Sequence, residues 1–456
     1  MITPPRAFPV FVAAGLVACL LLASGQPALA TNATNLLGYS AAAQGMAGAA
    51  LVSVLDTQLI NTNPASLFLL PDGTDRPADS AIKGGIGNFT LGVLQGYLHH
   101  TDAFGNDREG ENNPFIAIHG GLALRFRDLP RLTVGLGVFS QSGLGSDFRG
   151  LRTAFGTRDD VSSYERFVKL QSAISYEVTD DFALGIGPYL GYSDLTLHVF
   201  PRTGAAPVFA GLAIGDRCSR NFGVGEPGSD CPWTVVAGVK LGATWRITPI
   251  FTAGVAYTSP GSFHYDNGTA NVVFTPAGRA SRVSYDASVS GITHPQNVQM
   301  GFALKPLPRL LLALDLTWHD WSTFRGFTIK LRNPDTPGAP RRIDLFSRED
   351  WRDQFVVAVG AAYELIPDFV TVRAGYNYAN NPSPAATFSP AIQVPFEHHV
   401  TAGAGVKLAR HWELDAGFVY APEKKVTYTN QQLPFGPNAT ERPSGFSVDL
   451  TVGYRF

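Results

Sequence analysis

The sequence predicts an all-β protein, a transmembrane antiparallel β-barrel of about 14 strands that follows a compact N-terminal element without strands. Three observations carry this prediction. Residues 445–456 are apolar at even positions and small or polar at odd positions, the period of a strand with two different faces. Only 16% of the residues are charged, against about 25% in soluble proteins. After residue 30 no predominantly apolar run reaches the roughly 18 residues of a membrane helix.

Residues 1–30 have the features of a secretory signal peptide. Arg6 gives the positive start, residues 8–23 the apolar stretch, and Ala28-Leu29-Ala30 the small-x-small cleavage site. A competing interpretation takes residues 16–19 as a lipoprotein box with Cys19 as the lipidated residue. We favour the signal peptide because the apolar core continues past Cys19. The mature chain then begins at Thr31.

Residues 31–78 differ in composition from the rest and are predicted to form a compact element without strands. The stretch 39–55 is rich in Ala and Gly, has no charge and no period of two, and predicts one or two short helices. A turn-forming stretch follows and contains Asn63-Pro64-Ala65. Because proline restricts both itself and its predecessor, we expect Asn63 and Pro64 to fix a tight turn near the barrel wall.

Residues 79–456 are predicted to form the barrel, as strands separated by turn residues. The clearest alternation occurs at 116–126, 234–245, 310–318, 370–378 and 412–420. Less regular strands are expected at 82–98, 132–146, 164–178, 182–199, 250–266, 282–304, 353–364 and 396–408. Tryptophans near strand ends indicate aromatic girdles at the membrane interfaces, namely Trp245, Trp318, Trp351 and Trp412.

The connections alternate between short and long. Residues 128–131, 179–181, 247–249 and 306–308 are tight turns, whereas 101–113, 149–162, 201–231, 332–349, 381–394 and 427–443 are long and polar. Short turns at one rim and long loops at the other are typical of bacterial outer-membrane barrels. The sequence therefore predicts a multi-pass barrel in the outer membrane of a Gram-negative cell.

Charge and cysteine content limit the possible partners. A formal net charge of −2 gives no strong attraction to nucleic acid. Cys218 and Cys231 are the cysteines left after signal cleavage, and we expect a disulfide between them in an oxidising compartment. Two thiols without a nearby histidine pattern do not predict a metal site, and no motif predicts a cofactor.

Motifs along the mature chain occur in a recognisable order. The N-terminal part has Gly45–Ala50, then Asp56, then Asn63-Pro64-Ala65. Further stretches are Ser142–Phe148, Trp318–Phe324, Trp351–Asp353 and the aromatic ending Tyr454–Phe456. Together they resemble the FadL/TodX family of outer-membrane transporters for long-chain fatty acids and hydrocarbons.

The resemblance implies a monomeric, fourteen-stranded barrel whose lumen is plugged by a small N-terminal helical hatch, residues 31–78. In the family, a hydrophobic ligand passes from the extracellular loops into an apolar lumen. The ligand then leaves sideways into the membrane lipid through an opening at a kink in the third strand. Gly143 and Gly145 allow the irregular backbone of a kink. The expected kink and opening comprise Gly143, Leu144, Gly145, Ser146, Asp147 and Phe148. Lys169, Arg373 and Lys407 are basic residues available to a fatty-acid carboxylate, and without a basic group at the pocket a neutral hydrocarbon fits better.

The sequence does not predict an enzyme. The pairs His99-His100 and His398-His399 point to opposite faces of a strand and therefore cannot act on one centre. We expect passive uptake of hydrophobic small molecules. Two alternatives remain: a general diffusion porin, which lacks a plug, and a secreted β-sandwich adhesin, which is soluble.

Overall fold

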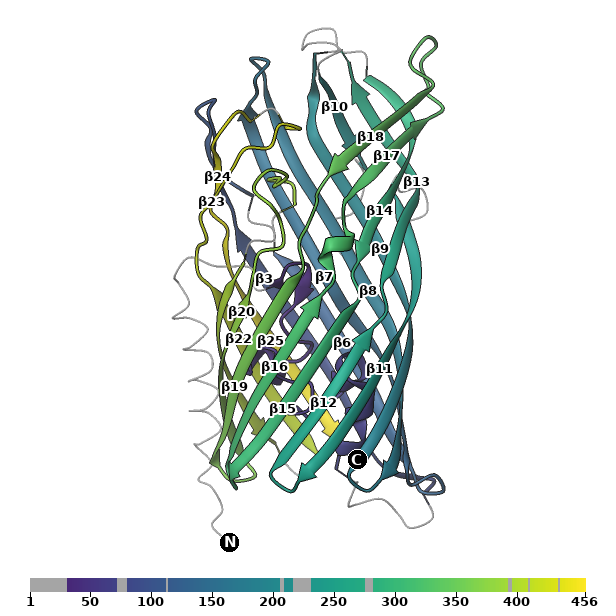
Figure 1. The fold of residues 1–456 in the computed structure, drawn as a ribbon, viewed down its shortest axis with the longest axis vertical. Helices are drawn as coiled ribbons and strands as arrows, with labels where there is room; N and C mark the ends of the chain where they lie inside the picture. The colour runs from purple at the N-terminus through teal and green to yellow at the C-terminus, as the bar shows by residue number, and fades with distance from the viewer. Residues whose placement is uncertain are drawn as a thin grey trace.

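A computed structural model describes residues 31–71, 80–111, 114–205, 209–215, 231–274, 282–392, 396–408, 411–433 and 435–456. The predicted signal peptide, residues 1–30, lies outside these ranges. None of the helices in the described ranges is long and apolar enough to cross a membrane. The chain forms a tall barrel of tilted strands with the N-terminal segment inside it (Figure 1).

Antiparallel pairing closes the wall into a ring. It runs from one strand to the next and returns from β25 to β3, where Phe446 pairs with Gln95 and Arg455 with Ile86. The strands of the ring, in order, are β3 (Ile82–Tyr97), β6 (Phe115–Phe126), β7 (Leu132–Arg152), β8 (Arg158–Thr179), β9 (Phe182–Ala205), β11 (Trp233–Thr248), β12 (Phe251–Thr258), β15 (Asn297–Leu307), β16 (Leu310–His319), β19 (Gln354–Ile366), β20 (Val370–Ala379), β21 (His398–Lys407), β22 (Trp412–Ala421) and β25 (Ser444–Arg455). The closed, all-antiparallel class is confirmed, and closure excludes the β-sandwich alternative.

The sheet as a whole has 21 strands, more than the expected number of about 14. Two of them, β1 (Thr31–Asn32) and β2 (Asn35–Leu36), belong to the N-terminal segment and join the sheet at β7. Five more raise one side of the wall. These strands are β10 (Phe209–Ile214), β13 (Gly261–Val273), β14 (Arg282–His294), β17 (Gly326–Arg332) and β18 (Arg342–Arg348). The predicted strands 250–266 and 282–304 each divide in two, at Pro260 and Pro295. Proline has no N–H for the ladder, and at these points the chain leaves the ring.

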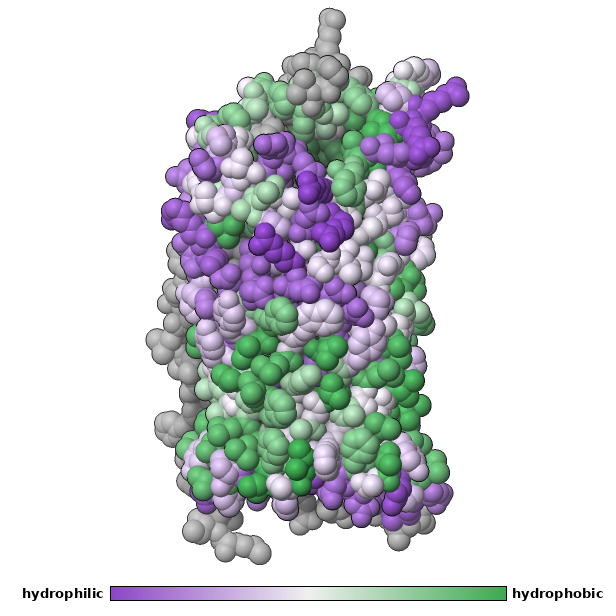
Figure 2. All heavy atoms as spheres, in the orientation of Figure 1, coloured by the Kyte–Doolittle hydropathy of each residue, from purple (hydrophilic) through white to green (hydrophobic). Residues whose placement is uncertain are grey.

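The two faces of the wall are reversed relative to a soluble protein. On β25, Ser447 and Asp449 face inward and are fully buried, whereas Leu450 and Val452 are 44% and 43% exposed on the outside. On the face that Figure 2 shows, apolar side chains cover much of the lower half of the barrel, and polar ones gather above them. An outward apolar band with a polar interior is the pattern of a barrel in lipid.

The N-terminal segment lies inside the barrel, in its lower half (Figure 1). It consists of β1 (Thr31–Asn32), β2 (Asn35–Leu36), α2 (Ala41–Gly45), α3 (Leu59–Thr62) and the 3-10 helix η1 (Pro64–Leu69). The predicted helices over 39–55 reduce to α2 alone, and the other helical turns fall after residue 55. Residues 72–79, which include the expected end of the hatch, lie outside the described ranges.

A second, small sheet lies at the long-loop end. Its strands, in pairing order, are β23 (Val426–Tyr428), β24 (Ala439–Glu441), β4 (His99–Thr101) and β5 (Asp107–Glu109). The remaining element is the 3-10 helix η2 (Trp321–Thr323). This sheet joins the loop after the first barrel strand to the loop before the last one, and so ties the two ends of the barrel sequence together.

Candidate functional site

Side chains of the wall hold the N-terminal segment by its backbone. Asp315 on β16 accepts hydrogen bonds from the amides of Ala50 and Leu51, both at 2.9 Å. The amide of Ala41, the first residue of α2, donates to Thr451 Oγ1 at 2.8 Å. These bonds satisfy buried amides that no secondary structure pairs, so the segment is fixed to several strands at once.

The predicted Asn63-Pro64-Ala65 turn lies against β11. Asn63 is the N-cap of η1, and its Oδ1 accepts from the amide of Ala65 at 3.2 Å. Its Nδ2 donates to Thr244 Oγ1 at 2.9 Å. One amide side chain therefore begins the helix and attaches it to the wall, and Pro64 at the first helical position needs no hydrogen-bond partner for its nitrogen.

Glycines of the wall make room for the N-terminal segment. A Cβ on Gly417 would lie 2.4 Å from the carbonyl oxygen of Ala41, and one on Gly242 would lie 2.0 Å from Asn63 Oδ1. Similar close approaches occur at Gly185, Gly254, Gly301, Gly360 and Gly375. Because a single added carbon collides at these positions, glycine is required where the two backbones touch.

The ladder between β6 and β7 breaks part of the way up. Its last pair is His119 with Phe139. Beyond it the Ser140 hydroxyl replaces the ladder, accepting from the amide of Ile118 and donating to its carbonyl, both at 3.1 Å. The register between β7 and β8 shifts between Ser140 and Ser142. A gap in the wall therefore starts at Ser140, with β7 bending away from β6.

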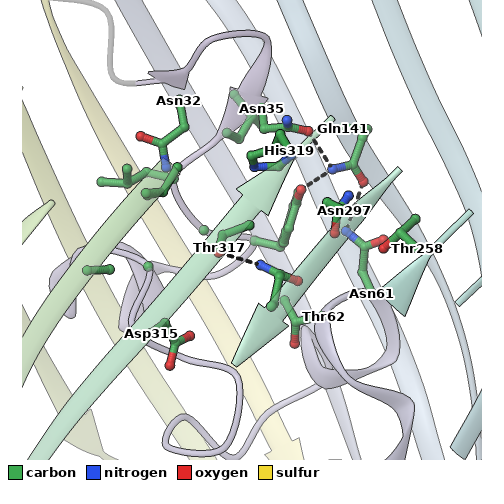
Figure 3. Close-up of a pocket in the computed structure, with 18 of the residues that line it drawn as sticks. Asn32, Asn35, Asn61, Thr62, Gln141, Thr258, Asn297, Asp315, Thr317 and His319 are labelled. Carbon is green, nitrogen blue, oxygen red and sulfur yellow. Dashed lines mark hydrogen bonds between the residues drawn. The ribbon is translucent and has the colours of Figure 1, made fainter. Parts of the chain in front are cut away.

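Next to the start of this gap, Asn35 and Asn61 of the N-terminal segment lie close to Gln141 on β7 (Figure 3). Gln141 donates to the hydroxyl of Tyr39 and, at 3.4 Å, to Asn35 Oδ1. It accepts from Asn61 Nδ2 at 3.1 Å. Asn35 also pairs through its backbone with Ser142 on β7. The inner side of the gap is therefore closed by hydrogen bonds between β7 and the N-terminal segment.

The expected kink residues occupy different surroundings. Gly143 is at the gap, where an added Cβ would lie 2.2 Å from the ring of Phe115, and Gly145 is exposed. The backbone of Leu144 pairs with Glu165 on β8. Further along β7, Ser146 Oγ donates to the carbonyl of Ala391, Asp147 pairs with Arg149, and Phe148 is buried beside His100. The bend starts at Ser140 and Gln141, which the sequence analysis did not single out.

An apolar cavity fills the upper lumen beside the gap. It encloses about 800 Å³ of empty space, part of it open to solvent. Aromatic rings form one wall, with the Trp321 and Trp351 centroids 4.7 Å apart and those of Phe324 and Trp351 5.2 Å apart. Trp351 is 2% exposed, so the prediction that it belongs to an interfacial girdle is wrong. Alternation along a strand predicts which face a side chain is on, but not how deeply that side chain is buried. Trp245 and Trp412 are 53% and 50% exposed on the outside, as expected of a girdle.

A second, polar chamber is lined by residues of the N-terminal segment and of the wall (Figure 3). It has about 710 Å³ of empty space, and His294 lines both spaces. The β1–β2 hairpin separates them, because Thr34 lines the apolar cavity while Asn32 and Asn35 line the polar chamber.

The basic residues singled out in the sequence are in three different places. Lys169 is 2% exposed, lines the polar chamber, and has its Nζ 4.3 Å from the centroid of Tyr189. Arg373 is paired with Asp415 at 2.7 Å, and Lys407 with Asp368 at 3.6 Å. Among the described lining residues of the apolar cavity there is no Lys or Arg.

The structure describes only one of the two cysteines of the predicted disulfide. Cys231 is disulfide-bonded and buried. Cys218, its predicted partner, lies outside the described residues. The pairing therefore stays a prediction.

A buried histidine joins the strands of the small sheet outside the apolar band. His100 on β4 donates from Nδ1 to Glu441 on β24 and from Nε2 to Asp102 Oδ2 at 3.1 Å. The hydroxyl of Tyr428 donates to the same Glu441 at 3.1 Å. Burial alone would lower the pKa of His100, but the hydrogen bonds from its ring to Asp102 and Glu441 outweigh this and raise the pKa to about 9.

We expect the small sheet to loosen in alkali. Because the pKa of His100 is raised, the charged pairing contributes fully below the ordinary value of 6.5 and is lost as the pH rises through about 9. Hydrogen exchange of residues 98–111 and 426–433 should therefore accelerate between pH 7 and 10, after correction for intrinsic exchange. His100→Gln should exchange rapidly at every pH. Equal protection of the wild type and of His100→Gln at pH 7 would contradict the role of His100 in holding the small sheet together.

The fold and the cavities define a class of protein: an outer-membrane barrel with an occupied lumen, an apolar cavity and a break in its wall. The family described as outer membrane protein transport protein (OMPP1/FadL/TodX) matches residues 19–456. The chain belongs to this family of outer-membrane channels for hydrophobic compounds, which are transporters and not enzymes.

Known relatives agree with this assignment. A 47 kDa outer membrane protein of Pasteurella multocida (strain Pm70) is 30% identical over 155 residues, which is 33% of this chain and 32% of that protein. The toluene transporter TodX of P. putida has a TM-score of 0.72 at 19% identity, over 92% of this chain and 99% of its own. The toluene transporter TbuX of Ralstonia pickettii has a TM-score of 0.69 at 18% identity, over 92% of this chain and 98% of its own. A Pseudomonas aeruginosa FadL homologue has a TM-score of 0.70 at 17% identity, over 93% of this chain and 99% of its own. These structural likenesses concern the fold.

Proposed function

We propose that this protein is a passive, monomeric channel that carries hydrophobic small molecules from the extracellular loops into the outer-membrane lipid. The observation that carries the proposal is the succession of an apolar cavity, a chamber and a gap in the wall at Ser140. Exposing each CH₂ of a ligand to water costs about 0.8 kcal/mol. A lateral route from the lumen to lipid avoids this cost.

Residues 31–78 are proposed to act as the hatch. In support, the described part of the segment is bonded to the inner wall at Asp315, Thr244 and Thr451. A general diffusion porin needs an open, water-filled lumen, and this segment occupies that space. The segment also obstructs a direct route along the lumen, and this favours lateral exit of the ligand.

The ligand class follows from the lining of the apolar cavity. A fatty-acid carboxylate in an apolar space needs a cationic partner, and the described lining has no Lys or Arg. We therefore propose a neutral, ring-sized hydrophobic compound, with long-chain fatty acids as the alternative. Two of the similar structures are described as toluene transporters.

Filling the cavity should block uptake. Val289 lines it and is 1% exposed, so Val289→Trp places an indole in the space that the ligand occupies. In Gram-negative cells without a transporter of their own, uptake of labelled toluene should fall to the level of cells without the protein. Val452→Trp, on the lipid face, should leave uptake unchanged. If labelled oleate is taken up and toluene is not, the fatty-acid alternative is correct.

A further inference from the structure

One indole of the apolar cavity lacks the hydrogen bond that its neighbours make. Trp351 Nε1 donates to Glu349 Oε2 at 3.3 Å, and Trp318 Nε1 donates to Asp353 Oδ2 at 3.0 Å. Trp321 lies between these residues and is 2% exposed, yet its Nε1 has no acceptor in the described part of the chain. A buried donor without a partner costs about 1–3 kcal/mol.

His294 presents a second unpaired nitrogen in the same place. Its ring centroid is 6.1 Å from that of Trp321, and its Nε2 is buried with no partner among the described residues. His294 lines both the apolar cavity and the polar chamber. The two unpaired groups therefore lie close together, at the end of the apolar cavity where a ligand passes into the chamber.

The chamber beyond is rich in hydrogen-bond donors. Lys169, Asn297 and Gln299 line it. The Nζ of Lys169 faces aromatic rings and has no acceptor among the described residues. A pure hydrocarbon leaves these polar groups unpaired when it displaces their water, whereas an oxygen atom on the ligand can accept from them.

The charge of the ligand is limited by Glu165, which also lines the apolar cavity. This carboxyl group is held by Ser142, Ser193 and Tyr265 at 3.2, 3.3 and 3.4 Å. An acidic side chain beside the cavity, with no Lys or Arg in its described lining, disfavours an anion.

We propose that the apolar cavity selects neutral aromatic compounds that carry one oxygen hydrogen-bond acceptor, such as an aryl ketone or aldehyde, over plain hydrocarbons. Trp321 Nε1 is the specificity-determining donor, and the surrounding rings of Phe324 and Trp351 stack on the aromatic part. The inference rests on the proposed function and narrows its substrate class.

A matched pair of ligands tests this selection. Acetophenone and ethylbenzene have nearly the same shape and differ in the carbonyl oxygen. Calorimetric titration of the full-length protein in one detergent should give tighter binding of acetophenone, by about tenfold after correction for partition into micelles, as expected of one net hydrogen bond. Trp321→Phe keeps a ring and removes the N–H, and should bring this ratio close to one.

Trp318→Phe is the matched control, because the N–H that it removes is already bonded to Asp353 and Trp318 is not among the described residues that line the apolar cavity. Its ratio should stay at the wild-type value. A wild-type ratio near one, equal ratios in wild type and Trp321→Phe, or tighter binding of benzoate than of acetophenone would overturn the inference. If ethylbenzene binds as tightly as acetophenone, the proposed channel function stands and the proposed selection fails. If none of the ligands binds, the channel function and the selection both fail.

Discussion

Replacement of Gly143 by tryptophan is expected to lower uptake of labelled toluene to the level of cells that lack the protein. An added Cβ at this position would lie 2.2 Å from the ring of Phe115, so the indole has to occupy the gap between β6 and β7. The gap starts where Ser140 ends the ladder with Ile118. If ligands leave through it, a bulky side chain there stops the last step of transport.

The variant should fold as a barrel. The ring closes by the pairing of β25 with β3, which the substitution on β7 does not touch, and heat-modifiable migration on a gel checks that the barrel is folded. Gly87→Trp on β3 is the matched control, because a Cβ there meets nothing closer than Leu122 Cδ1 at 3.7 Å. Normal uptake by Gly143→Trp would refute lateral exit at this point, while a loss in both variants would indicate general damage to the wall.

Much of the wall can be predicted from the sequence, because lipid and lumen impose a strict period of two. Residues 446–456 illustrate this: Leu450 and Val452 face outward, and Ser447 and Asp449 face inward, as their parity predicts. Parity does not report which partner a strand has. The splits at Pro260 and Pro295 produce the taller side of the wall. They depend on β14 pairing both with β13 and with β17, which follows much later in the chain.

The candidate site is less predictable, since it is assembled from distant segments. Gly143 and the Asn63-Pro64-Ala65 turn have local signals, namely glycine in a strand and proline after an N-cap residue. Gln141 has none, and its role depends on Tyr39 and Asn61 lying behind it. The sequence Trp318–Phe324 is noticeable in the chain, but that the Trp321 indole lies on a cavity wall follows from packing alone.

Removal of the N-terminal segment is expected to turn the barrel into an open pore. The inner wall beneath it is polar, with Thr90, Ser175 and Thr451 all nearly fully buried, and would be hydrated once the segment is gone. Deletion of residues 31–75 should therefore raise the single-channel conductance in planar bilayers from near zero to a porin-like value. Liposomes that contain the variant should swell rapidly in small sugars.

A point substitution separates an open lumen from a misfolded barrel. Gly417→Leu puts a side chain where α2 rests, since a Cβ there lies 2.4 Å from the carbonyl oxygen of Ala41. We expect a smaller rise in conductance than for the deletion, from a barrel that still shows heat-modifiable migration. Gly87→Leu, on the lipid side, should conduct like the wild type. If the deletion variant is folded and its conductance is unchanged, the segment is not what keeps the lumen closed, because the wall alone then excludes the solutes.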